Sequence, residues 1–256
     1  MKLVRTIAEV RSALPSGEIG LVPTMGAFHA GHLSLFRAAR AECDVVVVSL
    51  FVNPAQFGPT EDLDRYPRDE ANDARLAEDE GIDVLFVPTA EELYPRGYQT
   101  WVDVERLGRI LEGEHRPGHF RGVSTICLKL FNIVRPDRAY FGQKDAQQVA
   151  VLRQMIDDLN VDVELRVLPT VRDADGLAVS SRNRLLSARE RELALTLPRA
   201  LETRDPKRAQ ARLADADVET DYVGVFEDNG TRVLAAAVRV GAIRLIDNVP
   251  LEGGRS

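Results

Sequence analysis

The stretch IGLVPTMGAFHAGH, residues 19–32, decides the fold of this chain. Its first part, IGLVP, is a short apolar run that predicts a buried strand ending at Pro23. Gly26 and Gly31 follow, and glycines allow the backbone to approach a ligand closely. We expect a helix to begin directly after His32. A turn between a strand and a helix start favours phosphate, because free N–H groups and the positive end of the helix dipole face it.

Four further apolar runs predict strands. They are DVVVVSLFV (44–52), IDVLFV (82–87), RAYFG (138–142) and VDVELRVL (161–168). Several are apolar at consecutive positions, which is typical of strands that helices cover on both faces. Helical patterns lie between the strands at 33–41, 69–80, 123–134 and 145–159. This alternation predicts an α/β fold with a doubly wound, Rossmann-like parallel sheet, which binds ligands at the carboxyl ends of its strands.

The pattern of the chain changes after residue 171. A helix near 188–202 is followed by a polar stretch and then by three strand-like segments in hairpin spacing, DYVGVFE, TRVLAAAVRV and AIRLIDN. We therefore expect two domains. Residues 1–170 form the larger, Rossmann-like domain, and residues 171–256 form a smaller C-terminal α+β domain.

The composition is that of an ordinary globular protein, with 45% hydrophobic and 29% charged residues in a chain of 256. The formal net charge is −7 without a basic run, which argues against nucleic acid and anionic membranes as partners. Cys43 and Cys127 each lie beside an apolar run, so we expect two core residues rather than a disulfide framework. We expect neither a signal peptide nor a membrane span, and a cytoplasmic location.

The two histidines of HAGH, His29 and His32, lie inside the expected phosphate turn. An isolated HxxH is most often a surface or core decoration. The combination of a strand, a glycine turn, HxGH and a helix is instead similar to the nucleotidyltransferase group that includes the class I aminoacyl-tRNA synthetases. In that group the histidines stabilise charge on the attacked phosphate and on departing pyrophosphate.

Four later segments follow in an order and spacing that narrow the resemblance. They are FVNPAQFGPTEDLDRYPRD (51–69), RPGHFRGVST (116–125), YFGQKDAQQ (140–148) and VRDADGLAVSSRNRLLS (171–187). Together they resemble the pantothenate synthetase family, also called pantoate–β-alanine ligases, and the resemblance returns weakly at RLIDN. It implies a two-step reaction in which pantoate reacts with ATP to give pantoyl-adenylate, and β-alanine then displaces AMP. It also implies that residues 1–170 bind ATP and pantoate and that residues 171–256 act as a lid.

The resemblance also implies which residues form the site. The catalytic side chains would be those of His29, His32, Lys144 and Arg182, because positioned cations and donors best stabilise charge at the α-phosphorus. The expected ATP-binding residues are Met25, Gly26, His29, His32, Gly142, Gln143, Lys144, Asp145, Val171, Val179, Ser180, Ser181 and Arg182.

Two glutamines are the expected substrate residues. Gln56 and Gln148 would hold pantoate, and Gln56 would also contact β-alanine, since an amide can donate to a carboxylate and accept from a hydroxyl. For Gln148 there is a structural alternative, because Asp145 and Gln148 fit a helix capping box. Ser187 and Glu190 fit another such box, and there we expect a cap alone.

Magnesium is the expected cofactor, because ATP phosphates need a divalent partner. The acidic pair of the family is replaced here by Asn72 and Asp73, which leaves Asp73 as the metal ligand that the resemblance implies. The resemblance also implies a homodimer formed through the larger domain.

Two alternatives belong to other classes of function. All four histidines lie in HAGH or in GEHRPGHFRG (113–122), which we expect to be a mobile loop, so a zinc hydrolase could use His29, His32, His115 and His119. Such a site also needs a general base and an organised second shell, and it leaves KDAQQ and SSRN unexplained. A non-catalytic adenine-nucleotide sensor would bind ATP without releasing pyrophosphate when pantoate is added.

Overall fold

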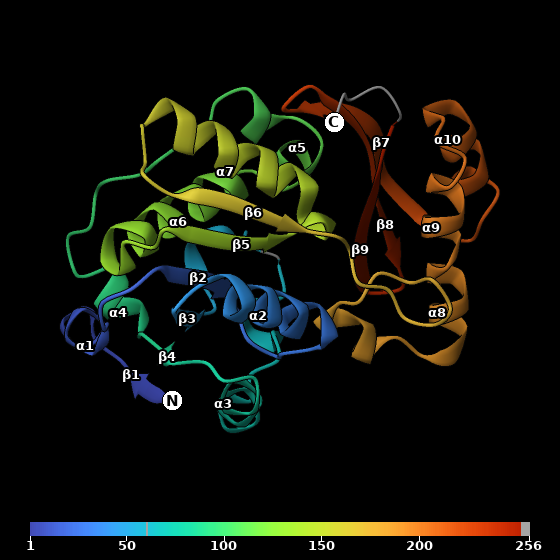
Figure 1. Cartoon of the computed structure of the whole chain (residues 1–256). Coiled ribbons are helices and arrows are strands. Elements are labelled where there is room, and N and C mark those ends of the chain that lie inside the picture. Colours follow the sequence, from blue (N-terminus) through green and yellow to red (C-terminus); the bar gives the residue numbers. More distant parts are fainter. Residues whose placement is uncertain (60, 252–256) are drawn as a thin grey trace.

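A sheet of six parallel strands organises the larger part of the molecule, in the order β1-β4-β3-β2-β5-β6 (Figure 1). The computed structural model describes residues 1–59 and 61–251. The strands are β1 (Lys2–Val4), β2 (Ile19–Thr24), β3 (Val45–Leu50), β4 (Val84–Phe86), β5 (Arg138–Gly142) and β6 (Glu164–Leu168). The five expected strands are confirmed, and β1 was missed because its three residues are too few to show a pattern.

Helices cover both faces of this sheet. One face packs against α1 (Ile7–Ala13), α4 (Ala90–Leu93), α6 (His119–Val134) and α7 (Ala146–Asp158), and the other against α2 (Ala30–Glu42) and α3 (Glu70–Asp79). Successive residues of β3 alternate between the two cores: Val45 and Val47 join the first, and Val46 and Val48 the second. This alternation explains why the strands are apolar at consecutive positions, and it confirms the doubly wound architecture.

The order of the strands reverses between β2 and β5. From β2 the chain moves outward through β3 to β4 on one side, while β5 and β6 follow on the other side. In open α/β sheets, ligands bind in the crevice outside the carboxyl ends of the strands at such a reversal. Residues 23–25 at the end of β2 and residues 142–145 at the end of β5 therefore flank the place where a ligand is expected.

The C-terminal part contains a three-stranded antiparallel sheet backed by helices. Its elements are α8 (Ala188–Ala194), α9 (Thr196–Leu201), α10 (Pro206–Ala214), β7 (Glu219–Asp228), β8 (Thr231–Val240) and β9 (Ile243–Pro250). The helix expected over 188–202 is divided at Leu195, since Pro198 has no N–H to continue the ladder. The helix α10 was missed, although Asp205 caps it and Pro206 is its first residue.

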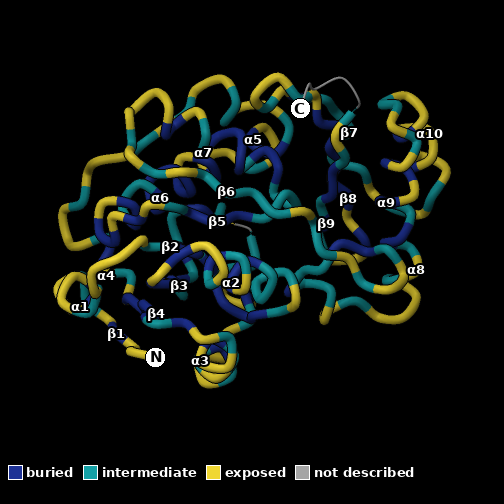
Figure 2. The backbone as a smooth tube through the Cα atoms, in the orientation of Figure 1, coloured by how far each residue is buried: buried dark blue, intermediate teal, exposed yellow. Residues whose placement is uncertain are grey.

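The small sheet packs on both of its faces. Leu234, Ala236 and Val238 of β8 face the helices α8–α10, and Val233 and Ala235 face the start of α7 in the larger part. Figure 2 shows β8 buried over most of its length. The division at residues 170 and 171 falls just after β6, between the two sheets. As a boundary between separately folding domains it stays a prediction.

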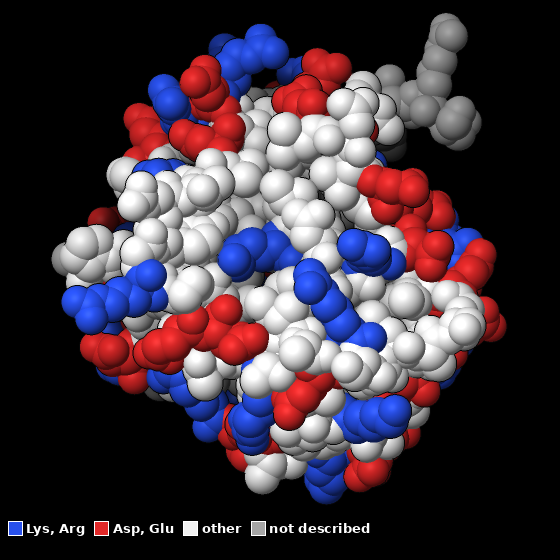
Figure 3. Space-filling view, turned by 90° about the vertical axis from the view of Figure 1, so that its left-hand side faces the viewer, with Lys and Arg blue, Asp and Glu red and all other residues white. Residues whose placement is uncertain are grey.

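The described surface is mixed in charge, and the described helices are short or polar. On the face that Figure 3 shows, Lys and Arg side chains lie among Asp and Glu side chains rather than in one continuous basic patch. Within residues 1–59 and 61–251, every helix is too short or too polar to cross a lipid bilayer. Cys43 and Cys127 are buried free thiols, as expected for core residues.

Candidate active site

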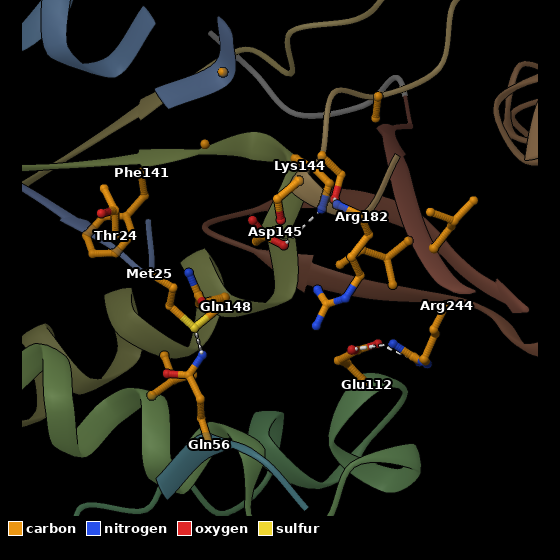
Figure 4. Close-up of a pocket in the computed structure, with 18 of the residues that line it drawn as sticks. Thr24, Met25, Gln56, Glu112, Phe141, Lys144, Asp145, Gln148, Arg182 and Arg244 are labelled. Atoms are coloured by element: carbon orange, nitrogen blue, oxygen red, sulfur yellow. Dashed lines mark hydrogen bonds and ion pairs between the residues drawn. The ribbon is translucent and has the colours of Figure 1, made fainter. Parts of the chain in front are cut away.

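A cavity of about 650 Å³ lies between the carboxyl ends of the parallel strands and the small sheet. It brings together residues from all the segments that the sequence singled out, as Figure 4 shows for Met25, Gln56, Lys144, Gln148 and Arg182. Of the expected site residues, all line this cavity except Gly26, Gln143 and Asp73.

The HAGH turn begins the helix rather than preceding it. The helix α2 starts at Ala30, so our expectation of a start after His32 was wrong. His29 is the N-cap: its Nδ1 accepts from the backbone N–H of Gly31 at 3.2 Å, while His32 Nδ1 accepts from the N–H of His29 at 3.4 Å. A ring nitrogen that accepts from an N–H carries no proton, so in each neutral ring the proton lies on Nε2. Both histidines can therefore donate from Nε2.

These two imidazoles are neutral around pH 7. Burial lowers the pKa of His29 to about 4, with help from the charges of Lys144 and Arg184. Burial, followed by the neighbouring His29 and Lys144, holds the pKa of His32 well below its ordinary value. Their rings stack with centroids 4.1 Å apart. The pair can thus offer hydrogen bonds to an anion without first taking up protons.

Asp73 supports this turn and is not placed to bind a metal ion in the cavity. Its two carboxylate oxygens accept from the backbone N–H groups of Ala27 and Phe28, both at 2.7 Å. It is buried outside the cavity lining, beneath a turn in which Gly26 and Ala27 both have positive φ angles. The structure therefore corrects two expectations: Asp73 holds the backbone of the turn, and Gly26 shapes it rather than lining the site.

The turn after β5 presents Lys144 to the cavity and ties Gln143 to the small sheet. Asn248 of β9 donates from Nδ2 to the carbonyl oxygens of Gln143 and Lys144, both at 2.9 Å, and its Oδ1 accepts from Gln143 at 3.4 Å. Gln143 is not among the residues that line the cavity, contrary to our expectation of a nucleotide contact. The ammonium of Lys144 lies 3.5 Å from Asp145, its neighbour in the cavity wall.

The segment 171–185 forms the opposite wall. The N–H of Val179 donates to the carbonyl of Val171 at 2.9 Å, which closes a hairpin with both side chains on the cavity. Ser180 caps the 3₁₀ helix that follows, Ser181–Leu185, and so positions Arg182. The guanidinium of Arg182 makes two hydrogen bonds to Asp62, at 2.8 and 2.9 Å.

Arg182 remains a cation in this contact. Burial acts to raise the pKa of Asp62, but the hydrogen bonds and the charge of Arg182 outweigh it and lower that pKa. The guanidinium also lies 5.5 Å from the centre of the Tyr66 ring. An incoming phosphate would therefore compete with Asp62 for Arg182.

Gln56 is fixed at its backbone by residues from the segment that we expected to be a mobile loop. His119 Nδ1 lies 2.9 Å from the carbonyl oxygen of Gln56, and Arg116 donates to the same oxygen at 3.4 Å. Residues Glu112–His115 form α5, and α6 begins at His119, so this segment is helical over most of its length. The expectation of a mobile loop was wrong, because the segment is helical and its Arg116 and His119 are held by internal hydrogen bonds.

Gln148 lines the cavity and makes no cap. Asp145 is the N-cap of α7 but has no side-chain hydrogen bond to the helix start, so the capping-box alternative was wrong. The neighbouring Gln147 is structural instead: its Nε2 donates to two backbone carbonyls, and its Oε1 accepts from Glu112. The second capping box, between Ser187 and Glu190, is confirmed.

A sequence model of one protein family matches almost the whole chain. The family is described as pantoate-beta-alanine ligase, and its model matches residues 2–250. The chain belongs to this family. The resemblance that the four quoted segments suggested is therefore confirmed.

Curated pantoate–β-alanine ligases match over nearly the whole chain. The pantothenate synthetase of Heliobacterium modesticaldum is 51% identical over 280 positions, which span 98% of this chain and all of the relative. That of Roseiflexus castenholzii is 52% identical over 277 positions with the same coverage. Because these alignments are longer than the 256 residues of this chain, the relatives carry residues that it lacks.

Solved structures of pantoate–β-alanine ligases share the fold. Pantothenate synthetase from Thermus thermophilus matches with a TM-score of 0.94 and 43% identity, covering 99% of this chain and all of the other. A pantoate-beta-alanine ligase from Francisella tularensis, described as complexed with beta-gamma ATP and beta-alanine, matches with a TM-score of 0.88 and 35% identity over both whole chains. Both the parallel sheet and the small antiparallel sheet belong to the shared fold.

The zinc alternative does not fit a member of this ligase family with this geometry. Across the described part of the chain, no three His, Cys, Asp or Glu side chains are grouped so that they could hold a metal ion. His119 is occupied by Gln56 and Arg116, and the ring of His115 packs against Tyr222 at 5.6 Å. The four histidines therefore lie along one cavity without converging on a point.

Several residues of the ligase site were missed by sequence reasoning. Glu112, buried in the cavity wall, pairs with Arg244 of β9 at 2.6 and 2.9 Å and accepts from the hydroxyl of Tyr222 at 3.1 Å. Burial acts to raise the pKa of Glu112, but Arg244 outweighs it and lowers the pKa to about 2. The motif RLIDN, in which Arg244 and Asn248 lie, was a signal in the sequence that could have marked them.

Proposed function

We propose that this chain condenses pantoate with β-alanine at the expense of ATP, in two steps on one site. In the first step a carboxylate oxygen of pantoate attacks the α-phosphorus, a new P–O bond forms, and the bond to the leaving pyrophosphate breaks. In the second step the β-alanine nitrogen attacks the acyl carbon, loses a proton, and releases AMP. The adenylate makes this possible because AMP is a far better leaving group than oxide.

The observation that carries the proposal is the convergence of four donors on one cavity. His29 and His32 offer Nε2–H groups, Lys144 an ammonium and Arg182 a guanidinium, each from a different position around it. Pre-positioned donors in a site shielded from water stabilise charge that develops on a phosphate. We assign the triphosphate to these four residues, and the rest of the nucleotide to Met25, Gly142, Asp145, Val171, Val179, Ser180 and Ser181.

We assign the acid substrate to Gln56 and Gln148, whose side chains lie on the same side of the cavity as Met25 (Figure 4). Gln56 also contacts β-alanine in this proposal. The two substrates then share one wall of the cavity, and the amine can reach the acyl carbon without the intermediate leaving.

Magnesium enters as the partner of the ATP phosphates. The described side chains provide no ready-made group of three ligands, and magnesium in nucleotide sites keeps phosphate oxygens and waters as most of its ligands. Asp145, which lines the cavity beside Lys144, is the carboxylate placed to add one more. We further propose a homodimer formed through the larger part of the molecule, working in the cytoplasm.

The direct test separates the two steps. Protein, ATP, magnesium and pantoate are mixed, and pyrophosphate and AMP are followed before and after β-alanine is added. The proposal expects one equivalent of pyrophosphate per site at first, and free AMP with pantothenate only after β-alanine. ATP binding without pyrophosphate release would favour the nucleotide sensor and overturn the proposal.

A further inference from the structure

A chain of hydrogen bonds leads away from the cavity wall at Asn53, which lines the cavity and whose amide has one possible orientation. The backbone N–H of Ala55 donates to Asn53 Oδ1 at 3.3 Å, and Asn53 Nδ2 donates to the carbonyl oxygen of Gly122 at 3.2 Å. A backbone N–H can only donate and a carbonyl can only accept. These two contacts therefore decide which end of the Asn53 amide is oxygen and which is nitrogen.

The orientation of Asn53 determines that of Gln56. Asn53 Nδ2 also donates to Gln56 Oε1 at 3.0 Å, so the nitrogen of the Gln56 amide must point the other way. That nitrogen faces the cavity, 3.2 Å from the sulfur of Met25 (Figure 4). Gln56 thus presents N–H donors to a ligand, while its own oxygen is occupied by Asn53.

The chain ends at Tyr94, which is not among the residues that line the cavity. Its hydroxyl lies 2.9 Å from Asn53 Oδ1 and must donate, because that atom is an oxygen acceptor. Burial raises the pKa of the Tyr94 phenol above its ordinary value, so the proton stays in place. Tyr94 follows the short helix α4 and packs on the rings of Tyr98 and Trp101.

We infer that Tyr94 is a positioning residue for recognition of the acid substrate. Its hydroxyl holds Asn53, and Asn53 holds the Gln56 amide with nitrogen toward the cavity, so that the wall selects an acceptor oxygen of the substrate. A Gln56 amide turned by half a rotation would present its oxygen and repel a carboxylate. The inference rests on the proposed function, since it assigns Gln56 to pantoate.

The test compares two conservative variants by steady-state kinetics, with pantoate and ATP varied separately. Tyr94→Phe removes only the hydroxyl that donates to Asn53. Tyr98→Phe is the control: it removes a hydroxyl from a neighbouring ring of the same aromatic group, and that hydroxyl makes no described contact with Asn53. The loss of one supporting hydrogen bond should raise the KM for pantoate roughly fivefold in Tyr94→Phe. In Tyr94→Phe the KM for ATP and kcat should stay within twofold of the wild type, and the thermal midpoint within a few degrees. In Tyr98→Phe all of these quantities, and the KM for pantoate, should stay within the same limits.

A third variant tests the orientation of the Gln56 amide without changing Tyr94. Asn53→Asp places an oxygen against Gln56 Oε1, so the amide must turn, and the rise in the pantoate KM should exceed that of Tyr94→Phe. An unchanged pantoate KM in Tyr94→Phe, or an equal rise for ATP, overturns the inference and leaves the proposed function standing. A wild type that forms no AMP from pantoate overturns both.

Discussion

At the scale of single residues, Lys144 is the clearest of the four donors to test. We expect Lys144→Ala to slow adenylate formation by roughly a hundredfold to a thousandfold, which is the usual effect of removing one donor to developing charge. The measurement is pantoate-dependent exchange of pyrophosphate into ATP. Lys207→Ala, on the exposed side of α10, is the matched control and should retain full exchange. Substantial exchange in Lys144→Ala would contradict the role assigned to it.

A second residue-scale prediction concerns His119 and pH. Burial, followed by the charge of Arg116, lowers the pKa of His119 to about 4, whereas an unfolded histidine titrates near 6.5. Between these values the unfolded chain binds a proton that the native protein does not, so the free energy of unfolding falls as pH drops from about 6.5 to about 4. The part due to this histidine is about 3 kcal/mol.

Denaturant unfolding of the wild type and His119→Gln at pH 7, 6 and 5 checks this. The variant is expected to be less stable at every pH, because it changes the contact with Gln56. Its stability should nevertheless fall less steeply with acid than that of the wild type. Parallel curves for the two proteins would show that His119 does not titrate as described.

Residue identities were predictable where a motif names a side chain that faces the cavity, as for His29, His32 and Lys144. They were not predictable where the role of a side chain depends on a residue distant in the sequence. Gln143 and Gln148 flank the same turn, but only Gln148 lines the cavity, whereas Gln143 is held by Asn248, 105 residues further along the chain. Asp73 fits a metal ligand by composition, and only the fold places it under the HAGH turn.

At the scale of elements, Gly122 fixes the distance between α6 and the 3₁₀ helix Pro54–Gln56. A Cβ added at Gly122 would lie 2.3 Å from the carbonyl oxygen of Ala55 and 2.7 Å from the Cα of Gln56. We therefore expect Gly122→Ala to push Gln56 out of place, raising the pantoate KM and lowering stability by about 1–3 kcal/mol.

Gly108→Ala is the control for this substitution. Its added Cβ would meet its nearest neighbour at 3.6 Å, an ordinary contact, and Gly108 lies in the 3₁₀ helix Leu107–Arg109. Kinetics and thermal unfolding of both variants give the comparison. If Gly122→Ala kept the pantoate KM of the wild type, the close packing of α6 would not be what positions Gln56.

Helices and strands were predicted well from the spacing of apolar residues where the strands were long and the helices amphipathic. The parallel sheet and the antiparallel hairpins were predicted from apolar runs and turn spacing. Boundaries depended on details that periodicity does not carry: α6 begins four residues earlier than expected, since Gly118 with its positive φ, rather than a polar cap, precedes it. The division of the helix at Leu195 has the same kind of local cause.

At the scale of the whole molecule, the buried pair of Glu112 and Arg244 joins α5 to the small sheet. Arg244 also donates to the carboxylate of Asp221 at 2.6 Å, so removal of Glu112 leaves this buried guanidinium with one of its two acidic partners. Glu112→Ala should therefore lower the free energy of unfolding by less than the loss of about 3–5 kcal/mol that follows when a buried pair is fully broken. Replacing both partners by apolar residues, Glu112→Leu with Arg244→Met, should cost much less than the sum of the single changes. A double-mutant cycle by chemical denaturation measures the difference.

The exposed pair of Arg75 and Asp79 on α3 is the control for this cycle. Its removal should change stability by less than about 1 kcal/mol. Additive effects at Glu112 and Arg244 would mean that the pair does not couple α5 to the small sheet. The pair of Glu112 and Arg244 is one contact by which the small sheet closes on the cavity.

The most direct measurement follows an oxygen atom. Pantoate labelled with ¹⁸O in its carboxylate is turned over with ATP, magnesium and β-alanine, and the products are analysed by mass spectrometry. If a carboxylate oxygen attacks the α-phosphorus in this cavity, that oxygen leaves with AMP, and each AMP carries one ¹⁸O. Unlabelled AMP, or label in inorganic phosphate, would contradict an adenylate formed at His29, His32, Lys144 and Arg182.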